Sequence, residues 1–599
     1  MTTSFGRIQF SQKGKRITSL LPAKPKPKLS NGPDEAELVR QRQYQFEAPP
    51  KISVVVPVYN TPIIYLTEMI RSVMVQTYQN WELCLAEGAS DNPEVQNTLA
   101  AYAAGDERVK IVLLPENRGV AGNTNQGLAL ASGEFVVFLD HDDILAPSAL
   151  FEVALAIVEH PGTSFIYSDY AVTDQHGKVL YPFFCPDFSK YFYLSFPYIV
   201  HLVAIRKMVL EEVGLMDEVM FNGGVSHDVD LFLRVFSRIS EDKVIHISQI
   251  LYYWRSHPSS AGQRFKDQVH HYTKLAINRY LSSADIDGWA EDGPLFNSFR
   301  IRLRTRRDPV VSVIIITHND WEPLQKSLSA LFSGNYSNIE VIVVSNGTDN
   351  RDALAFHASL SPECLVLKHD LSSNYSAIYN YAVRYAKGDV LVFLHEGVAF
   401  ASNDALSSLI ELCHLPEVGV VGAKLLYPDN RLQHAGIVLG LFGSAGHLHK
   451  YTDAYVDTEN LIPNRGYLSS LVSIREYSAV SGACLATKTK TFLEVNGFDE
   501  DFKSSYNDVD LCLRILEAGY KVLFTPYALS YYHESELTSE GTDRNTLYQA
   551  EDASLFLKKW GGYIEKGDPY FNRNLELNSH IPVPMTQLAS SRGGDGWNE

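Results

Sequence analysis

Long apolar runs and paired cysteines are both missing from this chain of 599 residues. No run is long enough to cross a bilayer and no signal peptide is recognisable, so we expect no membrane-spanning segment. The 6 cysteines are scattered, with no Cys-x-x-Cys pair. This spacing argues against zinc sites and a disulfide framework, and it favours buried free thiols in a reducing cytosol.

Positive charge is also scarce: the chain has 52 Lys and Arg against 70 Asp and Glu, which gives a formal net charge of −18. This balance argues against a nucleic-acid partner. The exception is a Pro-rich stretch at residues 1–50 with a cluster of lysines, which predicts a flexible basic arm. Two interpretations of the arm remain open: peripheral contact with an anionic membrane surface, or a solvated leader.

The chain is too long for one hydrophobic core, and it repeats itself at a distance of about 255–280 residues. β-Branched runs at 52–60 and 311–319 open the two units, and Asp228–Arg234 resembles Asp508–Arg514 near their ends. In each unit strand patterns alternate with helical ones, which predicts a mostly parallel sheet. We therefore predict an α/β protein with two tandem Rossmann-like domains at 51–304 and 309–560, joined near 305–308, and a C-terminal extension at 561–599.

Three carboxylates, Asp140, Asp142 and Asp143, directly follow the apolar run 134–139. That run has the pattern of a buried parallel strand, and ligands bind at the carboxyl ends of such strands. Carboxylates this close repel one another unless a cation lies among them. Oxygen ligands suit Mg²⁺ or Mn²⁺, which also bind phosphate oxygens. A solvated acidic turn is the simpler alternative.

The order of several short motifs resembles the family 2 glycosyltransferases of GT-A fold, in the tandem form found in bacterial surface-polysaccharide synthesis such as O-antigen and capsule. The similarity extends from about Lys51 to Leu575. The pieces that carry it are Val56-Pro57-Val58-Tyr59-Asn60, Glu116-Asn117-Arg118-Gly119, Leu139-Asp140-His141-Asp142-Asp143, Tyr167-Ser168-Asp169, Asp228-Val229-Asp230-Leu231, Tyr253-Trp254-Arg255-Ser256-His257, Ser481-Gly482-Ala483-Cys484, Asn496-Gly497-Phe498-Asp499, Asp508-Val509-Asp510-Leu511, His533-Glu534-Ser535 and Gly567-Asp568-Pro569-Tyr570-Phe571-Asn572.

The resemblance implies transfer of a sugar from a nucleotide-diphosphate donor, UDP- or dTDP-linked, to a glycan or lipid-linked glycan acceptor. Its Asp-x-Asp metal motif falls on Asp140 and Asp142, with His257 as a third ligand for Mn²⁺ or Mg²⁺. The implied donor contacts are Pro57, Tyr59, Glu87, Asn125, Asp140 and Arg255. Glu87 departs from the family's usual Asp at the base-binding position, and Gly88 replaces an acidic residue. Such enzymes are cytoplasmic, with peripheral contact at the inner face of the plasma membrane.

Asp228 matches the family's catalytic base, which removes the acceptor proton in an inverting single displacement. His227 stands where the family usually has Glu. A carboxylate here could instead cap the first turn of a helix, and the two roles are compatible. Asp230 is better explained as a structural residue, and Tyr198 and His201 fall in the acceptor-loop region.

The second unit differs at the metal motif, which reads His395-Glu396-Gly397, and at the base-binding position, which is Ser345. Asp508, His533 and Glu534 remain, so Glu396 with His533 could hold Mn²⁺. We favour an altered second site that positions the acceptor or a partner.

Two alternatives for the second unit stay open: two active transferase sites, or a glycan-binding scaffold with one vestigial site. A nucleotidyltransferase is disfavoured because no Gly-rich basic loop follows the first strand.

Overall fold

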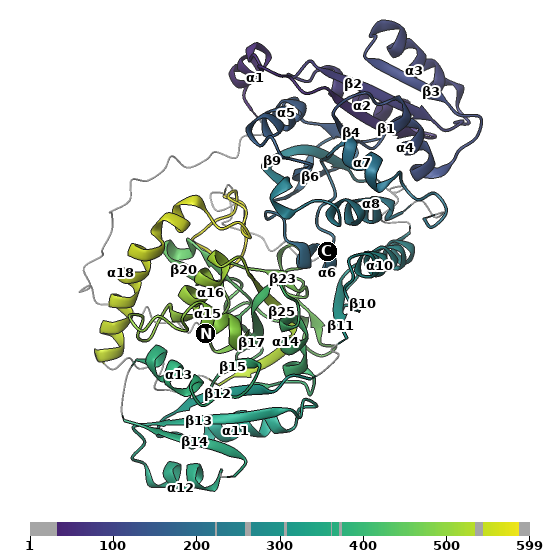
Figure 1. Ribbon diagram of the computed structural model, residues 1–599. Helices are drawn as coiled ribbons and strands as arrows, with labels where there is room; N and C mark the ends of the chain where they lie inside the picture. Colours follow the sequence, from purple (N-terminus) through teal and green to yellow (C-terminus); the bar gives the residue numbers. More distant parts are fainter. Residues whose placement is uncertain are drawn as a thin grey trace, which may run out of the picture.

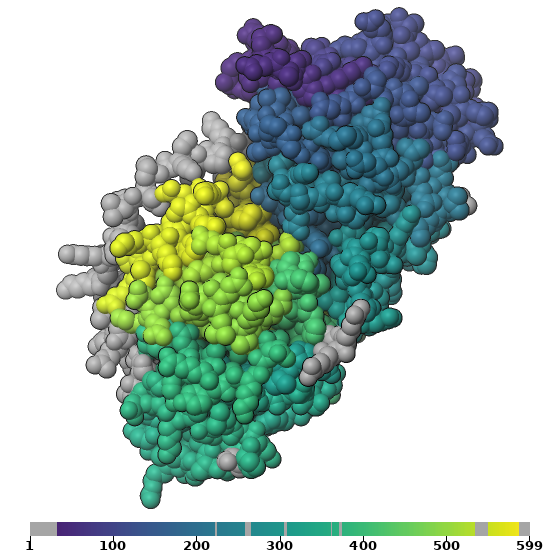
Figure 2. All heavy atoms as spheres, in the orientation of Figure 1, coloured from purple at the N-terminus to yellow at the C-terminus, as the bar shows by residue number. Residues whose placement is uncertain are grey.

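The computed structural model describes residues 33–221, 225–257, 265–304, 308–360, 362–370, 374–533 and 543–585, which form two lobes in contact (Figures 1 and 2). The lysines of the predicted arm, the linker residue Thr305, and Glu534 with Ser535 lie outside these ranges. Among the residues described, no helix has the length and apolar content needed to cross a bilayer. The cysteines are all buried and unpaired, as predicted.

The predicted flexible arm was wrong for its last part, because Glu35–Gln43 forms helix α1. Asp34 caps it by accepting from the N–H of Glu37 at 2.8 Å. Gln41 is buried and docks α1 on the first domain: its amide oxygen accepts from the Thr77 hydroxyl at 2.9 Å and its amide nitrogen donates to Glu152 at 3.2 Å.

The first domain is a mixed sheet in the order β3-β2-β1-β4-β8-β6-β9-β5, with β7 paired to β6. Strands β1–β4, β6 and β9 run in one direction, and β8 is antiparallel between β4 and β6. Its elements are β1 Ile52–Val58, α2 Ile63–Met74, β2 Trp81–Glu87, α3 Pro93–Gly105, β3 Val109–Leu113, α4 Gly119–Leu130, β4 Phe135–Phe138, β5 Ile144–Leu145, α5 Ala149–Glu159, β6 Phe165–Thr173, β7 Val179–Phe183, α6 Lys190–Ser195, β8 Val203–Arg206, α7 Lys207–Val213, α8 His227–Phe236, η1 Glu241–Lys243, β9 Val244–Arg255, α10 Lys266–Ser283, β10 Gly288–Asp292 and β11 Phe299–Leu303.

The second domain repeats this order as β14-β13-β12-β15-β24-β17-β25-β16, with β18 and β23 added at the side. Its elements are β12 Val311–Thr317, α11 Trp321–Phe332, β13 Ile339–Asn346, α12 Arg351–Ser359, β14 Cys364–His369, α13 Tyr375–Val383, β15 Val390–His395, β16 Val398–Phe400, α14 Ala405–Cys413, β17 Val418–Leu426, β18 Leu432–His434, β19 Ile437–Leu439, η2 Leu441–Gly443, β20 Ala445–His447, β21 Tyr455–Asp457, β22 Ile462–Pro463, η3 Tyr467–Ser469, β23 Arg475–Glu476, β24 Cys484–Lys488, α15 Thr489–Glu494, α16 Asn507–Glu517, β25 Lys521–Tyr532 and α18 Asp543–Lys566. The predicted fold class, α/β with two tandem and mostly parallel domains, is confirmed.

Buried β-branched and aromatic side chains explain the strands. Every residue of β1 and of β12 is buried, as expected for central parallel strands covered on both faces by helices. Burying such side chains contributes about 1.5–3 kcal/mol each before entropy is subtracted. The cores therefore hold the carboxyl ends of β1 and β4 at one fixed edge of the first sheet.

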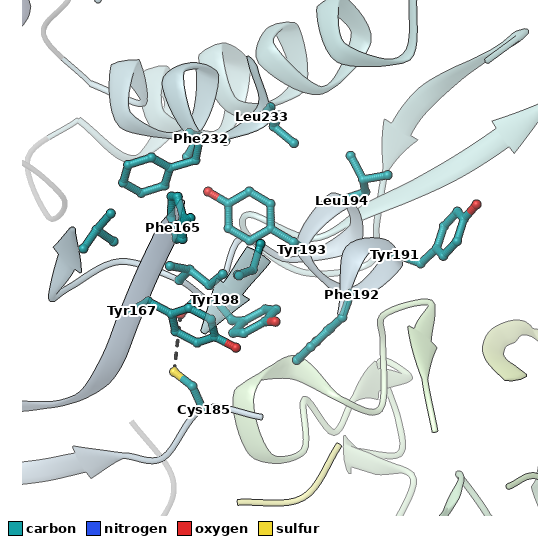
Figure 3. Packing of buried hydrophobic residues seen from close by; sticks show 14 of the residues in the cluster. Phe165, Tyr167, Cys185, Tyr191, Phe192, Tyr193, Leu194, Tyr198, Phe232 and Leu233 are labelled. Carbon is teal, nitrogen blue, oxygen red and sulfur yellow. Dashed lines mark hydrogen bonds between the residues drawn. The ribbon is translucent and has the colours of Figure 1, made fainter. Parts of the chain in front are cut away.

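The short helix α6 joins the two domains, and all of its residues but the first are buried. Figure 3 shows Tyr193 pointing toward α8, whereas Phe192 points toward the second domain. There the Arg475 guanidinium lies 4.6 Å from the Phe192 ring centroid. The buried carboxylate of Glu476 accepts from the Ser189 hydroxyl and from the N–H of Tyr191 at 3.1 Å. Removing that carboxylate would leave buried donors unpaired, so the domain contact is specific.

The C-terminal segment after α18 binds back to the first domain. Asn572 donates to Asp169 at 2.9 Å and to the carbonyl of Cys185 at 2.7 Å. Asp169 and Asp187 flank the buried ring of His246, at 2.9 and 3.0 Å from its two nitrogens. Burial alone would lower the pKa of His246, but these two carboxylates raise it from 6.5 to about 9.

The His246 cluster makes a prediction about pH. Because the folded-state pKa is the higher one, its stabilising contribution is complete below about 6.5 and is lost as pH rises through about 9. The shift corresponds to roughly 3 kcal/mol of unfolding free energy. Urea unfolding at pH 6.5 and 9.5 should show this loss in the wild type and not in His246→Gln. An equal loss in both proteins would contradict the assignment.

Candidate functional site

Asp143 anchors the acidic turn that follows β4. Its buried carboxylate accepts from the Tyr252 hydroxyl and from the N–H of Arg255, both at 2.7 Å. Both partners belong to β9, so these two hydrogen bonds fix the turn to the carboxyl end of that strand. Burial, and then the charges of Asp140 and Asp142, raise the pKa of Asp143 well above its usual value.

Asp142 lies beside His257, with 2.7 Å between its Oδ2 and the Nε2 of the imidazole. The guanidinium of Arg255 fixes the same turn by donating to the carbonyl oxygen of Asp142 at 2.8 Å. The structure therefore brings together two of the three predicted metal ligands, Asp142 and His257.

Asp140 lies beside a different histidine, His201, at 3.8 Å between Oδ2 and Nε2. The His201 ring stacks on Tyr252, with 4.2 Å between centroids. Asp140, Asp143 and His201 each offer a ligand atom within 4.8 Å of the other two, the one group of three of this kind in the described part of the chain. Burial lowers the pKa of His201 to about 4, so its ring is neutral near pH 7, as a metal ligand must be.

Electrostatics also favour a cation at this place. Desolvation and the charge of Asp142 raise the pKa of Asp140 to about 6. The Asp140 side chain is still 48% exposed, so solvent reduces the effect of desolvation on its pKa. The other cause is repulsion by Asp142, which a bound cation would remove. Carboxylate oxygens with a neutral imidazole form a donor set suited to Mn²⁺ or Mg²⁺.

The first turn of α8 presents Asp228 to the same region. Its Oδ1 accepts only from the adjacent N–H of Val229 among the hydrogen bonds of the described residues, at 2.9 Å. Its charge acts on both Asp140 and His201. Asp230, two residues further along the helix, is buried and accepts from Arg234 at 2.8 Å and from Arg279 at 3.2 Å. Asp230 thus has the structural role that its pattern suggested, and Asp228 is left available for chemistry.

Two of the predicted donor contacts are already engaged within the protein. Glu87 is fully buried and accepts from the N–H of Ser90 at 2.6 Å and from Gln96 at 2.9 Å. Asn125 is buried in α4, where it donates to the carbonyl of Met216 at 3.0 Å. Both residues shape the loops around the site, and their contact with a donor stays a prediction.

The remaining predicted donor contacts lie at the sheet edge. Pro57 is within β1, opposite Ala86, and Tyr59 follows the strand with 38% of its surface exposed. The buried guanidinium of Arg255 pairs with Glu68 at 2.6 Å and donates to the carbonyl of Gln175 at 3.0 Å. Arg255 therefore holds the acidic turn in place. Its direct contact with a diphosphate also stays a prediction.

Strand register identifies what the second domain has at each of these positions. Val55 pairs with Phe138 in the first sheet, and Ile314 pairs with Phe393 in the second. Phe138 and Phe393 then pair with Val203 and Leu485 in the next strands. Counting from these pairs, the equivalents are His395 for Asp140, Gly397 for Asp142, Val398 for Asp143 and Ala483 for His201.

Three predicted residues of the second domain keep their places around this altered turn. Asp508 begins α16 and accepts from the N–H of Gly482 at 2.7 Å, and burial raises its pKa. Burial raises the pKa of Glu396 to about 7. The N–H of His533 donates to the carbonyl of Gly397 at 2.9 Å. No group of three metal-binding side chains forms here among the described residues.

Sequence reasoning missed the place of three histidines. His141 and His227 each have a buried Nδ1 without a hydrogen-bond partner among the described residues, and both rings influence the pKa of Asp140. The departure from Glu at position 227 was the only signal. His201 was assigned to the acceptor-loop region, because nothing local in the sequence shows that its ring stacks on Tyr252.

Comparison with known proteins finds matches in both domains. The model described as Glycosyl transferase family 2 matches residues 53–213 and 312–437. Uncharacterized protein y4gI of Sinorhizobium fredii is 35% identical over 553 residues, which are 90% of this chain and 59% of that protein. O-antigen biosynthesis protein RfbC of Myxococcus xanthus is 32% identical over 540 residues, 88% of this chain and 40% of that protein.

A third relative matches over a shorter stretch. The Escherichia coli protein WfgD, named UDP-Glc:alpha-D-GlcNAc-diphosphoundecaprenol beta-1,3-glucosyltransferase, is 33% identical over 129 residues, 21% of this chain and 49% of that protein. This chain spans about half the length of the curated relatives that it matches.

Proposed function

Because this chain belongs to glycosyl transferase family 2, with two tandem GT-A domains, we propose that its first domain transfers a sugar from a nucleotide-diphosphate donor to a glycan acceptor. The observation that carries the proposal is the convergence of Asp140, Asp142, Asp228 and His201 at the carboxyl edge of one sheet. The O-antigen relative supports a role in surface-polysaccharide synthesis. The name of the Escherichia coli relative supports a UDP-linked donor and a lipid-linked acceptor.

The residues divide the work between them. Asp140 and Asp142, with His257 or His201, would hold Mn²⁺ or Mg²⁺, which when bound neutralises charge on the donor diphosphate. Asp228 takes the proton of the acceptor hydroxyl while the acceptor oxygen forms a bond to the anomeric carbon of the donor sugar. The bond from that carbon to the phosphate oxygen breaks, and the nucleoside diphosphate leaves with the electron pair. One displacement with one base inverts the anomeric configuration.

The second domain has lost this cation site. Histidine, glycine, valine and alanine stand where the first domain has Asp140, Asp142, Asp143 and His201. Val398 and Ala483 cannot bind a cation through their side chains. We therefore assign the second domain to binding the acceptor. The alternative of two active sites is favoured by the retention of Asp508 in the first turn of α16.

Donor hydrolysis tests the proposal without knowledge of the acceptor. A panel of UDP- and dTDP-sugars incubated with the full chain should release nucleoside diphosphate from one donor class. Release should fall at least tenfold when EDTA removes the metal, and Mn²⁺ should restore it. No release from any donor, or release that EDTA leaves unchanged, would contradict the proposed function.

A further inference from the structure

The second domain carries an insertion that the first domain lacks. Residues 427–483, between β17 and β24, are about twice as long as residues 174–202, between β6 and β8. The insertion includes the hairpins β19–β20 and β21–β22. It also contains half-exposed aromatic rings, and rings that gather in one patch mark a surface for a ligand or partner more than single exposed rings do.

Four rings form one connected cluster, which we call the aromatic platform: Tyr427, Phe442 and Tyr451 from this insertion, and His580 from the segment after α18. Tyr427 and Tyr451 are parallel within 2°, with centroids 5.8 Å apart. His580 lies 4.6 Å from Phe442 and 5.7 Å from Tyr451. Phe442 and Tyr451 remain 49% and 52% exposed. Phe442 and Tyr451 thus keep about half of their surface open to solvent while ring contacts hold them in place.

The backbone holds both exposed rings in an unfavourable conformation. Phe442 has φ 54° and Tyr451 has φ 68°, in the left-handed region that bulky residues avoid. Each is held by a backbone hydrogen bond, from Phe442 to Leu577 at 2.8 Å and from Tyr451 to Leu432 at 2.7 Å. Such strain persists where the surrounding structure imposes it and is concentrated at functional sites.

Two hydrogen bonds attach the insertion that carries these rings to the N-cap of α16 and to β25 of the second domain. On one side, the hydroxyls of Ser444 and Tyr506 are 3.0 Å apart, and Tyr506 caps the helix that carries Asp508. On the other side, the Tyr531 hydroxyl donates to Asn430 at 2.7 Å. Tyr531 adjoins Tyr532, whose hydroxyl is 3.2 Å from His395. The insertion is thus bound to the two elements, α16 and β25, whose counterparts in the first domain, α8 and β9, carry Asp228 and Arg255.

We propose that the aromatic platform binds the pyranose rings of the acceptor glycan; this deepens the proposed function and rests on it. The apolar face of a pyranose packs on an aromatic ring, and Tyr also offers a polar end to the sugar hydroxyls. Lys450, whose amine lies over the Tyr451 ring at 5.2 Å from its centroid, is a hydrogen-bond donor at the platform for sugar hydroxyls.

The charge around the platform favours a neutral glycan over a membrane surface. Arg431 pairs with Asp429 at 2.6 Å, and Lys450 has Asp453 nearby in sequence. Anionic lipid is attracted by clusters of several unpaired basic residues, which this balanced surface does not have in the described residues.

Glycan capture by the full chain tests the platform. Wild type, Tyr451→Ala, Phe442→Ala, Tyr451→Phe and the control Tyr181→Ala are applied to an array of bacterial polysaccharides and pyranose oligosaccharides, without metal or nucleotide. Tyr181 is a matched control because it is 48% exposed on β7 of the first domain. Wild type, Tyr451→Phe and Tyr181→Ala should capture the same glycans, and each alanine variant of the platform should lose about tenfold in affinity.

Three outcomes would overturn the platform proposal. The first is that the wild type captures no glycan, and the second is that capture is unchanged in both Tyr451→Ala and Phe442→Ala. The third is no capture together with Tyr451-dependent sedimentation on phosphatidylglycerol vesicles. Thermal unfolding identifies any variant that fails to fold, and the other variant then decides. Donor hydrolysis by the same proteins separates the two proposals, because the platform variants should keep it. Hydrolysis without platform-dependent capture defeats the platform alone, and absent hydrolysis in wild type defeats the proposed function.

Discussion

Asp228→Asn is expected to lower the rate of sugar transfer by about 10²–10⁴-fold, the usual contribution of a general base. The amide cannot take a proton, but it has the shape of the carboxylate and can still accept from the N–H of Val229, as Asp228 does at 2.9 Å. The start of α8 should therefore persist, and binding of UDP with Mn²⁺ should stay within about twofold, since the base touches the acceptor. Single-turnover kinetics measures the expected loss of sugar transfer, and calorimetry measures the expected retention of UDP binding.

Asp508→Asn is the matched control, because Asp508 has the same place at the start of α16 that Asp228 has in α8. With an acceptor-binding second domain, this variant should keep its transfer rate within about threefold and its full set of product linkages. Near-normal sugar transfer by Asp228→Asn would contradict the assignment of Asp228 as the catalytic base. Loss of one linkage type in Asp508→Asn would instead show that both domains are active.

Asp142→Ala is expected to abolish metal-dependent nucleotide binding and to lower turnover by about 10³-fold or more. A cation at a departing diphosphate supplies several kcal/mol, and about 1.4 kcal/mol corresponds to each factor of ten. The Asp142 side chain is 18% exposed and contacts His257, whereas buried Asp143 makes the bonds that hold the turn to β9. The thermal unfolding midpoint should therefore change by only a few degrees.

Glu396→Gln is the control for this variant, since Glu396 occupies the equivalent turn after β15 in the second domain. It should leave Mn²⁺-dependent UDP binding unchanged. Turnover by Asp142→Ala at a tenth or more of the wild-type rate would contradict a metal role for this carboxylate.

The fold could be predicted because both sheets have central strands of continuous β-branched residues. Val109–Leu113 is the strand that the pattern predicted, and the runs at 52–60 and 311–319 contain β1 and β12. The repeated Asp-x-Asp-Leu segments match each other as equivalent parts of the two units, and each lies in the first turn of a helix, α8 or α16. Patterns of this kind are local, so a single sequence suffices to find them.

The sequence could not predict contacts that depend on packing between distant segments. His201 comes next to Asp140 because it stacks on Tyr252, which is far from both along the chain. Asn572 reaches Asp169 across the domain contact, with more than 400 residues between them in sequence. Helix α1 was missed because it is short and polar and is held by the contacts of Gln41 with the first domain.

Counting Mn²⁺ bound per chain in the presence of saturating UDP, by electron paramagnetic resonance, tests the central claim most directly. With a cation site in the first domain and none in the second, wild type should bind one Mn²⁺ per chain and Asp142→Ala none. A count of zero or two in the wild type, or of one in Asp142→Ala, would contradict it.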